Sequence, residues 1–185
     1  LGRETEIRAR QSQFGLELEG VRIVEPGKSA DYDDYVNTYF ELRKHKGIRE
    51  EDARDRMLDP TYYSTMMVYK GHADGMVSGS VTTTQQTIRP AFEIIKTKPG
   101  SKIVSSVFLM CLKDRVLVYG DCAVNPNPTA EELAEIALSS AHTASLFGIE
   151  PRVAMLSYSP GSPGKGQDAA KGIAATSLRR ELAPE

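Results

Sequence analysis

The sequence has 185 residues, of which 40% are hydrophobic, so the chain can bury a core and is not expected to be disordered. Its formal net charge of -2 lacks the excess of Lys and Arg that nucleic-acid binding requires, and its longest apolar run, at 103–112, is far shorter than the roughly 20 residues of a membrane helix. Cys111 and Cys122 have no CxxC spacing, which predicts neither a disulfide framework nor a zinc site and favours a reduced, cytoplasmic location.

Short β-branched runs alternate with segments of helical period, which is typical of an α/β protein with a mainly parallel sheet. In the first part of the chain we expect helices at 3–14, 30–45, 49–58 and 61–70, and a strand at 21–24. The second helix has apolar or aromatic residues on one face, and Gly47 is placed to end it. That face consists of Tyr32, Tyr35, Val36, Tyr39 and Leu42.

The second part begins with an expected strand at 76–77, a polar loop at 78–87 and a helix at 87–96, with Arg89 at its start and Pro90 in its first turn. The runs at 103–112 and 116–119 predict two strands paired as a hairpin. Thr129-x-x-Glu132 is a capping box that opens a helix ending at Gly148. A buried strand at 152–156 and a final helix toward Leu182 complete the expected order.

Ligands of open α/β sheets bind beyond the carboxyl ends of strands, so the loops at 78–87, 120–128 and 157–166 are the candidates. The first loop has the parts of an anion site: Gly79 lets backbone approach a ligand, and hydroxyls and a guanidinium surround it. An ordinary polar loop before a capped helix explains the same composition equally well. The donors are Ser78, Ser80, Thr83, Thr84 and Arg89.

The other two loops carry weaker signals. Asp121 and Cys122 are a possible base and nucleophile, but no histidine lies nearby in the sequence, and a structural Cys122 is favoured. The three histidines are scattered, so no metal site is expected. The third loop combines three glycines with Lys165, yet Gly166 stands where a P-loop has Ser or Thr, which argues against an NTPase.

Five segments together resemble the phosphate acetyltransferase family, and their order and spacing match over nearly the whole chain. They are Glu41–Ile48 (ELRKHKGI), Ala73–Gly79 (ADGMVSG), Thr87–Ala91 (TIRPA), Asp121–Thr129 (DCAVNPNPT) and Pro151–Ser159 (PRVAMLSYS).

The resemblance implies a two-domain acyltransferase fold, an α/β three-layer sandwich with mainly parallel sheets, in which residues 1–115 form most of the first domain and 116–185 begin the second. It also implies a homodimer that transfers acetyl between acetyl phosphate and coenzyme A, with coenzyme A as a substrate and no metal or bound cofactor. In such a mechanism a carboxylate deprotonates the thiol, while arginine and serine groups hold phosphate and the developing oxyanion.

By the same resemblance, Arg43 and Arg89 match two family arginines that bind substrate, especially coenzyme A. Cys122 matches a cysteine near the cleft that the chemistry does not require. Pro160 and Pro163 depart from the family, which usually has Thr after the Leu-Ser-Tyr-Ser run. The remaining substrate-binding candidates are Ser78, Gly79, Thr83, Thr84, Tyr158 and Ser159.

The family's general base, with its serine and arginine, is expected beyond Glu185, and a strand and helix unit is expected before Leu1. This chain alone is therefore expected to be inactive. Two alternatives stay open at this point. One is a phosphate butyryltransferase; the other is a non-catalytic domain that senses acyl-coenzyme A, similar to the terminal domain of some malic enzymes.

Overall fold

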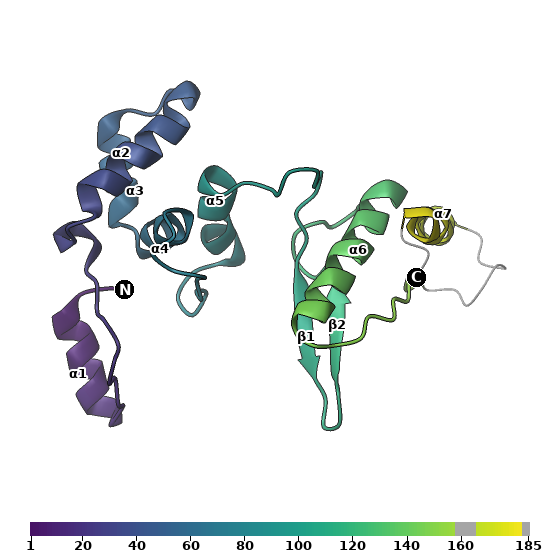
Figure 1. Ribbon diagram of the computed structural model, residues 1–185, viewed down its shortest axis with the longest axis horizontal. Coiled ribbons are helices and arrows are strands. Elements are labelled where there is room, and N and C mark those ends of the chain that lie inside the picture. Colours follow the sequence, from purple (N-terminus) through teal and green to yellow (C-terminus); the bar gives the residue numbers. More distant parts are fainter. Residues whose placement is uncertain (158–165, 183–185) are drawn as a thin grey trace. The chain divides into compact units, whose positions relative to one another are not determined.

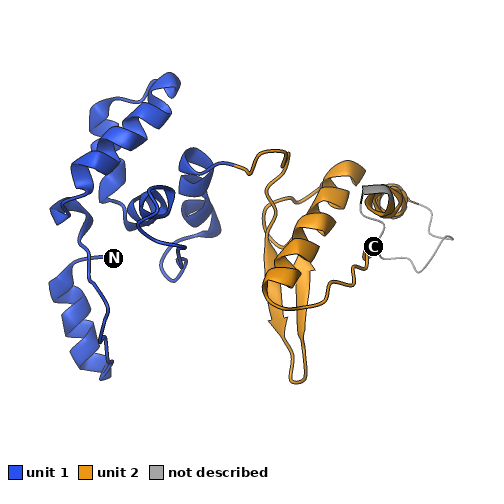
Figure 2. Cartoon of the chain, viewed as in Figure 1, with its two compact units in different colours: residues 1–96 blue, residues 97–185 orange. Residues whose placement is uncertain are grey.

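The computed structural model describes residues 1–157 and 166–182 (Figure 1). The chain divides into two compact units, residues 1–96 and 97–185 (Figure 2). Each unit has buried residues of its own. Within the described residues, no helix is both long and apolar enough to cross a membrane.

The first unit is helical. Its main helices are α1 (Glu4–Phe14), α2 (Tyr32–Arg43), α3 (Glu50–Leu58), α4 (Pro60–Tyr69) and α5 (Thr84–Ile94), and short 3-10 turns lie at Pro26–Lys28 and Lys44–Lys46. Local chemistry sets the boundaries. Gly47 has φ 78°, a left-handed conformation that glycine adopts without strain, and it follows the turn that extends α2, as predicted. Asp59 caps α4 by accepting a hydrogen bond of 2.7 Å from the Thr61 N–H.

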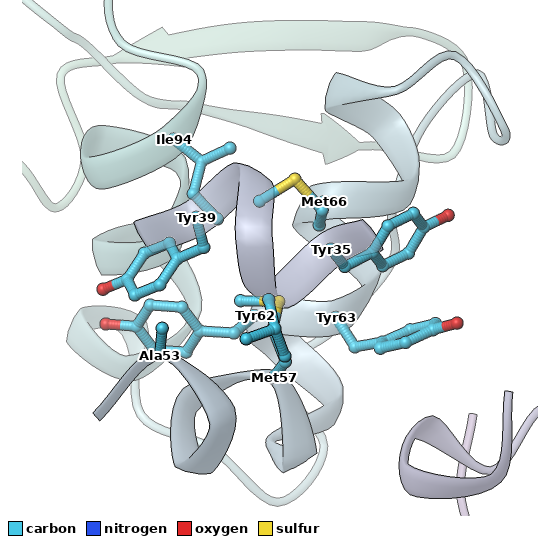
Figure 3. Close-up of a cluster of buried hydrophobic side chains, with 9 residues drawn as sticks. Tyr35, Tyr39, Ala53, Met57, Tyr62, Tyr63, Met66 and Ile94 are labelled. Carbon is cyan, nitrogen blue, oxygen red and sulfur yellow. The ribbon is translucent and has the colours of Figure 1, made fainter. Parts of the chain in front are cut away.

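Aromatic side chains dominate the core of the first unit (Figure 3). The predicted apolar face of α2 is confirmed, because Tyr35, Val36 and Tyr39 are all buried. The Tyr35 and Tyr63 rings have centroids 4.8 Å apart, and the Tyr39 and Tyr62 rings meet edge to face at 5.7 Å. The core is completed by Ala53 and Met57 of α3, Met66 of α4 and Ile94 of α5.

Helix α5 begins three residues before the predicted start. The Thr83 hydroxyl accepts a hydrogen bond from the Gln86 N–H at 3.2 Å, and the Gln86 side chain accepts one from the Thr83 N–H at 2.9 Å. This capping box starts the helix at Thr84. The placement of Arg89 at the helix start and of Pro90 in the first turn was therefore wrong. Pro90 lies inside α5, where its buried side chain offsets the missing N–H.

Three predicted strands form no sheet among the described residues: 21–24, 76–77 and 152–156 have neither strand nor helix geometry. Within the described chain the buried strand predicted at 152–156 does not form, since Leu156 is 85% exposed. A strand needs a neighbour to pair with, and β-branched composition alone does not supply one. The described chain is a mixed α/β structure with a single two-stranded sheet.

The second unit contains the predicted hairpin. Strands β1 (Val107–Cys111) and β2 (Val116–Gly120) pair antiparallel, with Val107 opposite Gly120. Helix α6 (Ala130–Leu146) packs on β2 and on α7 (Gln167–Leu182). Gly120 permits this close approach, because a Cβ there would lie 2.4 Å from the Ser140 Oγ. The buried residues of α6 and α7 are mostly small: they are Ala134, Ile136, Ala137 and Ala144 of α6 and Ala169 and Ala175 of α7.

The two compact units divide between Lys96 and Thr97, whereas the sequence-based domain boundary falls between residues 115 and 116. Residue 115 lies in the turn between β1 and β2. The sequence-based boundary refers to the domains of a longer two-domain protein, and it stays a prediction.

Candidate functional site

Two of the predicted substrate-binding residues meet at one buried carboxylate. Arg89 of α5 donates from its Nε to the Glu93 Oε1 at 2.9 Å. Arg43, the last residue of α2, places its Nη2 3.8 Å from the same oxygen. Residues that are 46 positions apart in the sequence thus share a single anionic partner. The structure places both guanidinium groups at one site of the first unit.

Glu93 is also held by two tyrosines, one of α2 and one of α4. Its Oε2 accepts hydrogen bonds from the Tyr39 hydroxyl at 2.7 Å and the Tyr62 hydroxyl at 3.0 Å. Figure 3 shows these two hydroxyls on the same side of the aromatic core. Burial by itself would raise the pKa of Glu93, but bonds from Tyr39, Arg89 and Tyr62 and the charge of Arg43 lower that pKa below its usual value. Glu93 is therefore a fixed anion at neutral pH.

The two tyrosines are fixed donors. Burial, together with the hydrogen bond to Glu93, raises the pKa of Tyr39, and burial with the charge of Glu93 raises the pKa of Tyr62. Both hydroxyls therefore remain protonated at neutral pH and keep donating.

The two arginine side chains differ in their exposure and in the bonding of their Nε atoms. The Arg89 side chain is 56% exposed, and its hydrogen bond to Glu93 uses Nε. That bond raises the pKa of Arg89. The Arg43 side chain is 22% exposed, and its buried Nε has no hydrogen-bond partner. Guanidinium groups arranged in this way are suited to hold a phosphate or carboxylate group and not to transfer protons.

The other candidates from the first loop are exposed. Ser78 and Gly79 precede α5, Thr83 caps it, and Thr84 is its first residue. The Thr83 hydroxyl is engaged by the cap, since it accepts from the Gln86 N–H. In the part of the chain that the structure describes, no hydrogen bond joins these four residues to Arg43 or Arg89.

The second loop has a different chemistry from the one that its residue types suggested. Burial alone would raise the pKa of Asp121, but hydrogen bonds from Val124, Ala123, Asn125 and Ser106 lower it to about 2. A carboxylate of that pKa is a weak general base for a thiol of pKa about 8.5. The Cys122 Sγ donates to the Ser106 Oγ at 3.2 Å, which fits the favoured structural role of Cys122.

Tyr158, Ser159, Pro160 and Pro163 lie outside the described residues. Among residues 1–157 and 166–182, no group of three or more His, Cys, Asp or Glu side chains could hold a metal ion.

Glu93, Tyr39 and Tyr62 were not predicted from the sequence as members of this site. One signal could have found Glu93: it lies four residues after Arg89, the spacing at which helical side chains of opposite charge pair. The tyrosines gave no comparable signal, since their helical spacing fits any apolar face.

The whole chain, residues 1–185, matches the family model described as "Phosphate acetyl/butaryl transferase". The chain is 65% identical over 185 residues to a phosphate acetyltransferase of Nitratidesulfovibrio vulgaris, covering 100% of the chain and 26% of that protein. It is 49% identical over its full length to a phosphate acetyltransferase of Corynebacterium glutamicum, of which it covers 56%.

Solved structures give a consistent result. A phosphotransacetylase from Streptococcus pyogenes aligns with a TM-score of 0.87 and 41% identity, over 100% of this chain and 56% of that chain. The EutD phosphotransacetylase from Staphylococcus aureus aligns with a TM-score of 0.86 and 39% identity, over 99% of this chain and 55% of that chain. The present chain thus spans between about a quarter and about half of the length of these relatives.

Proposed function

The chain belongs to the phosphate acetyl/butaryl transferase family, and from that premise we propose that it forms the coenzyme A-binding part of a phosphate acetyltransferase. The observation that carries the proposal is the convergence of Arg43 and Arg89 on Glu93. Coenzyme A carries several phosphate groups and acetyl phosphate carries one, and an arginine pair is the recognition chemistry that such substrates need.

The reaction proposed is a thiol attack on an acyl phosphate. A base removes the thiol proton, the sulfur forms a bond to the acetyl carbon, and the bond from that carbon to the phosphate oxygen breaks to release inorganic phosphate. Neither Asp121 nor Glu93 suits the base, because hydrogen bonds lower the pKa of each below its usual value. The resemblance assigns the base to a segment outside the present sequence, so the residues of this chain are proposed to bind and orient.

Further residues are proposed to line the same substrate cleft: Ser78, Gly79, Thr83 and Thr84, with Tyr158 and Ser159. Two of them support the proposal by position. Thr83 and Thr84 lie at the N-terminus of α5, where backbone N–H groups and the helix dipole favour an anion. Coenzyme A is proposed as a substrate and not as a resident cofactor, and no metal is invoked.

Acetyl is preferred over butyryl as the transferred group because the relatives at 65% and 49% identity are named phosphate acetyltransferases. Their names also favour an enzyme over an acyl-coenzyme A sensor. A homodimer and a cytoplasmic location are proposed on the resemblance and on the reduced cysteines.

A mainly parallel sheet is proposed for the longer protein. The support is that Val77 and Leu156, in two of the predicted strand segments, expose apolar side chains that a sheet would cover. Hydrogen exchange at 76–77 and 152–156 should be slow in a longer protein that contains this sequence, and fast exchange there would refute the proposal.

The binding proposal is tested by calorimetric titration of coenzyme A into the 185-residue chain. Replacing Arg43 or Arg89 with Ala should weaken binding by about 1.5 to 3 kcal/mol each, the contribution of a hydrogen bond to a charged group. Arg54→Ala is the matched control, because Arg54 also pairs with a carboxylate four residues away but lies on α3, outside the site. Unchanged affinity in both test variants would remove the pair from the binding site.

The reaction is tested separately on a longer protein that contains this sequence. Acetyl phosphate should be consumed faster than butyryl phosphate, with acetyl-coenzyme A as the product. A higher rate with butyryl phosphate would transfer the assignment to the butyryl member of the family. The inactivity of the 185-residue chain alone stays a prediction, which the same assay checks.

A further inference from the structure

We propose that Glu93 is the positioning residue of the arginine pair: it holds Arg89 and Arg43 in the arrangement that binds the phosphate groups of coenzyme A. This inference rests on the proposed function. It assigns to Glu93 no contact with substrate, since the carboxylate is buried and would act through the two guanidinium groups.

The two oxygens of the Glu93 carboxylate have different partners. Oε2 receives both tyrosine hydroxyls, from Tyr39 of α2 and Tyr62 of α4. Oε1 faces both arginines, at 2.9 Å from the Arg89 Nε and 3.8 Å from the Arg43 Nη2. The tyrosines therefore fix the orientation of the carboxylate, and in this orientation Oε1 faces Arg89 and Arg43.

The contact with Glu93 leaves the two terminal nitrogens of Arg89 available. A guanidinium is a rigid planar group, so a hydrogen bond at Nε also fixes the directions of its two terminal nitrogens. Within the described residues, neither terminal nitrogen of Arg89 makes a hydrogen bond, and the side chain is 56% exposed. Glu93 thus binds the Nε of Arg89 and leaves its two terminal nitrogens, Nη1 and Nη2, available to a ligand.

The charge of Glu93 also keeps the two arginines together. Arg43 and Arg89 carry like charges toward one point, and their repulsion would separate them if the carboxylate were neutral. The ionised Glu93 offsets one of the two charges and leaves the group with a net charge of about +1, which still attracts a phosphate. A neutral side chain of the same size would keep the packing and lose this restraint.

Glu93→Gln is the informative substitution, because it preserves volume and removes the charge. The dissociation constant of coenzyme A should rise roughly tenfold, the scale of one hydrogen bond to a charged group. Arg89→Ala should then have a much smaller effect in the Glu93→Gln background than in the wild type, because Glu93 acts through Arg89. Glu50→Gln is the matched control: Glu50 also lies four residues from an arginine, Arg54, but its side chain is 59% exposed.

An unchanged dissociation constant in folded Glu93→Gln would overturn the proposal, and so would additive effects of the two substitutions, which a merely structural role predicts. Circular dichroism establishes that each variant is folded.

A ligand-free measurement covers the case in which Glu93→Gln does not fold, and it separates this inference from the proposed function. In nuclear magnetic resonance spectra of the wild type, the Arg89 Nε–H should exchange with water more slowly than that of Arg10, which bonds Gln13 through Nη1. Equal exchange rates would refute the positioning role. Slow exchange in a chain that does not bind coenzyme A would support the held arginine while refuting the proposed function.

Discussion

At the scale of single residues, two carboxylates of this chain have been made into weak bases by their surroundings. Burial alone would raise the pKa of Glu93 and of Asp121, yet in each case the hydrogen bonds donated to the ionised form outweigh burial and lower the pKa. Residue type suggested a base at Asp121, whereas the bonds around it indicate an anchor for the loop that follows β2. The Asp121 Oδ1 accepts hydrogen bonds from the N–H groups of Ala123 and Val124 at 2.7 and 2.9 Å.

The lowered pKa of Asp121 makes stability depend on acid. Because the pKa falls from 3.8 to about 2 on folding, the stabilisation is fully present above about pH 4 and is lost as the pH falls toward 2. The expected loss is about 1 to 2 kcal/mol, after allowance for the partial exposure of the group. Urea unfolding at pH 2, 3, 4 and 6 measures it.

Asp121→Asn should flatten this dependence, so that wild type and variant converge at low pH. Asp114→Asn, in the exposed hairpin turn, is the control and should retain the wild-type dependence. If the free energy of unfolding depended on pH in the same way for wild type and Asp121→Asn, Asp121 would not contribute to the acid sensitivity.

Glu93 predicts a second acid effect on the same physical basis. The groups that face it are Tyr39 and Arg43 of α2, Tyr62 of α4 and Arg89 of α5. Since folding lowers its pKa, protonation below that value should weaken both the helix packing and the arginine pair.

At the scale of elements, helix starts were decided by side chains three residues apart. The Thr129 hydroxyl accepts from the Glu132 N–H at 3.2 Å, and Glu132 accepts from the Thr129 N–H at 2.8 Å, as the sequence predicted for α6. The same signature at Thr83 and Gln86 starts α5. Recognising it would have placed Arg89 and Pro90 correctly within that helix.

Thr129→Ala should destabilise the second unit by about 1 kcal/mol, because the N–H of Glu132 loses its acceptor. Thr143→Ala on the same helix is the control; the Thr143 hydroxyl donates to the Ser139 carbonyl, which already lies within the helix. Urea unfolding curves compare the two, and equal destabilisation by both substitutions would contradict a specific role of the cap.

At the scale of the molecule, the first unit has its core within residues 1–96. A chain of residues 1–96 should therefore unfold cooperatively in urea. A chain of residues 1–115 adds β1 without β2, which leaves the β1 backbone unpaired beside the exposed side chains of Phe108, Leu109 and Met110. Light scattering should then detect more association for 1–115 than for 1–96. Cooperative unfolding of 1–115 together with its absence in 1–96 would favour the sequence-based boundary instead.

Local pattern was enough to predict the helices, the antiparallel hairpin and the two arginines as candidates, because caps, helical spacing and family motifs are written in neighbouring residues. The tertiary structure alone decided that Arg43 and Arg89 share Glu93, that two tyrosines hold this carboxylate, and that Asp121 is too weak a base. These depend on which groups from distant segments meet, and on the balance of burial and hydrogen bonding that sets each pKa. The predicted strands that are not formed among the described residues have the same cause, since pairing requires a neighbour that a strand's own sequence does not contain.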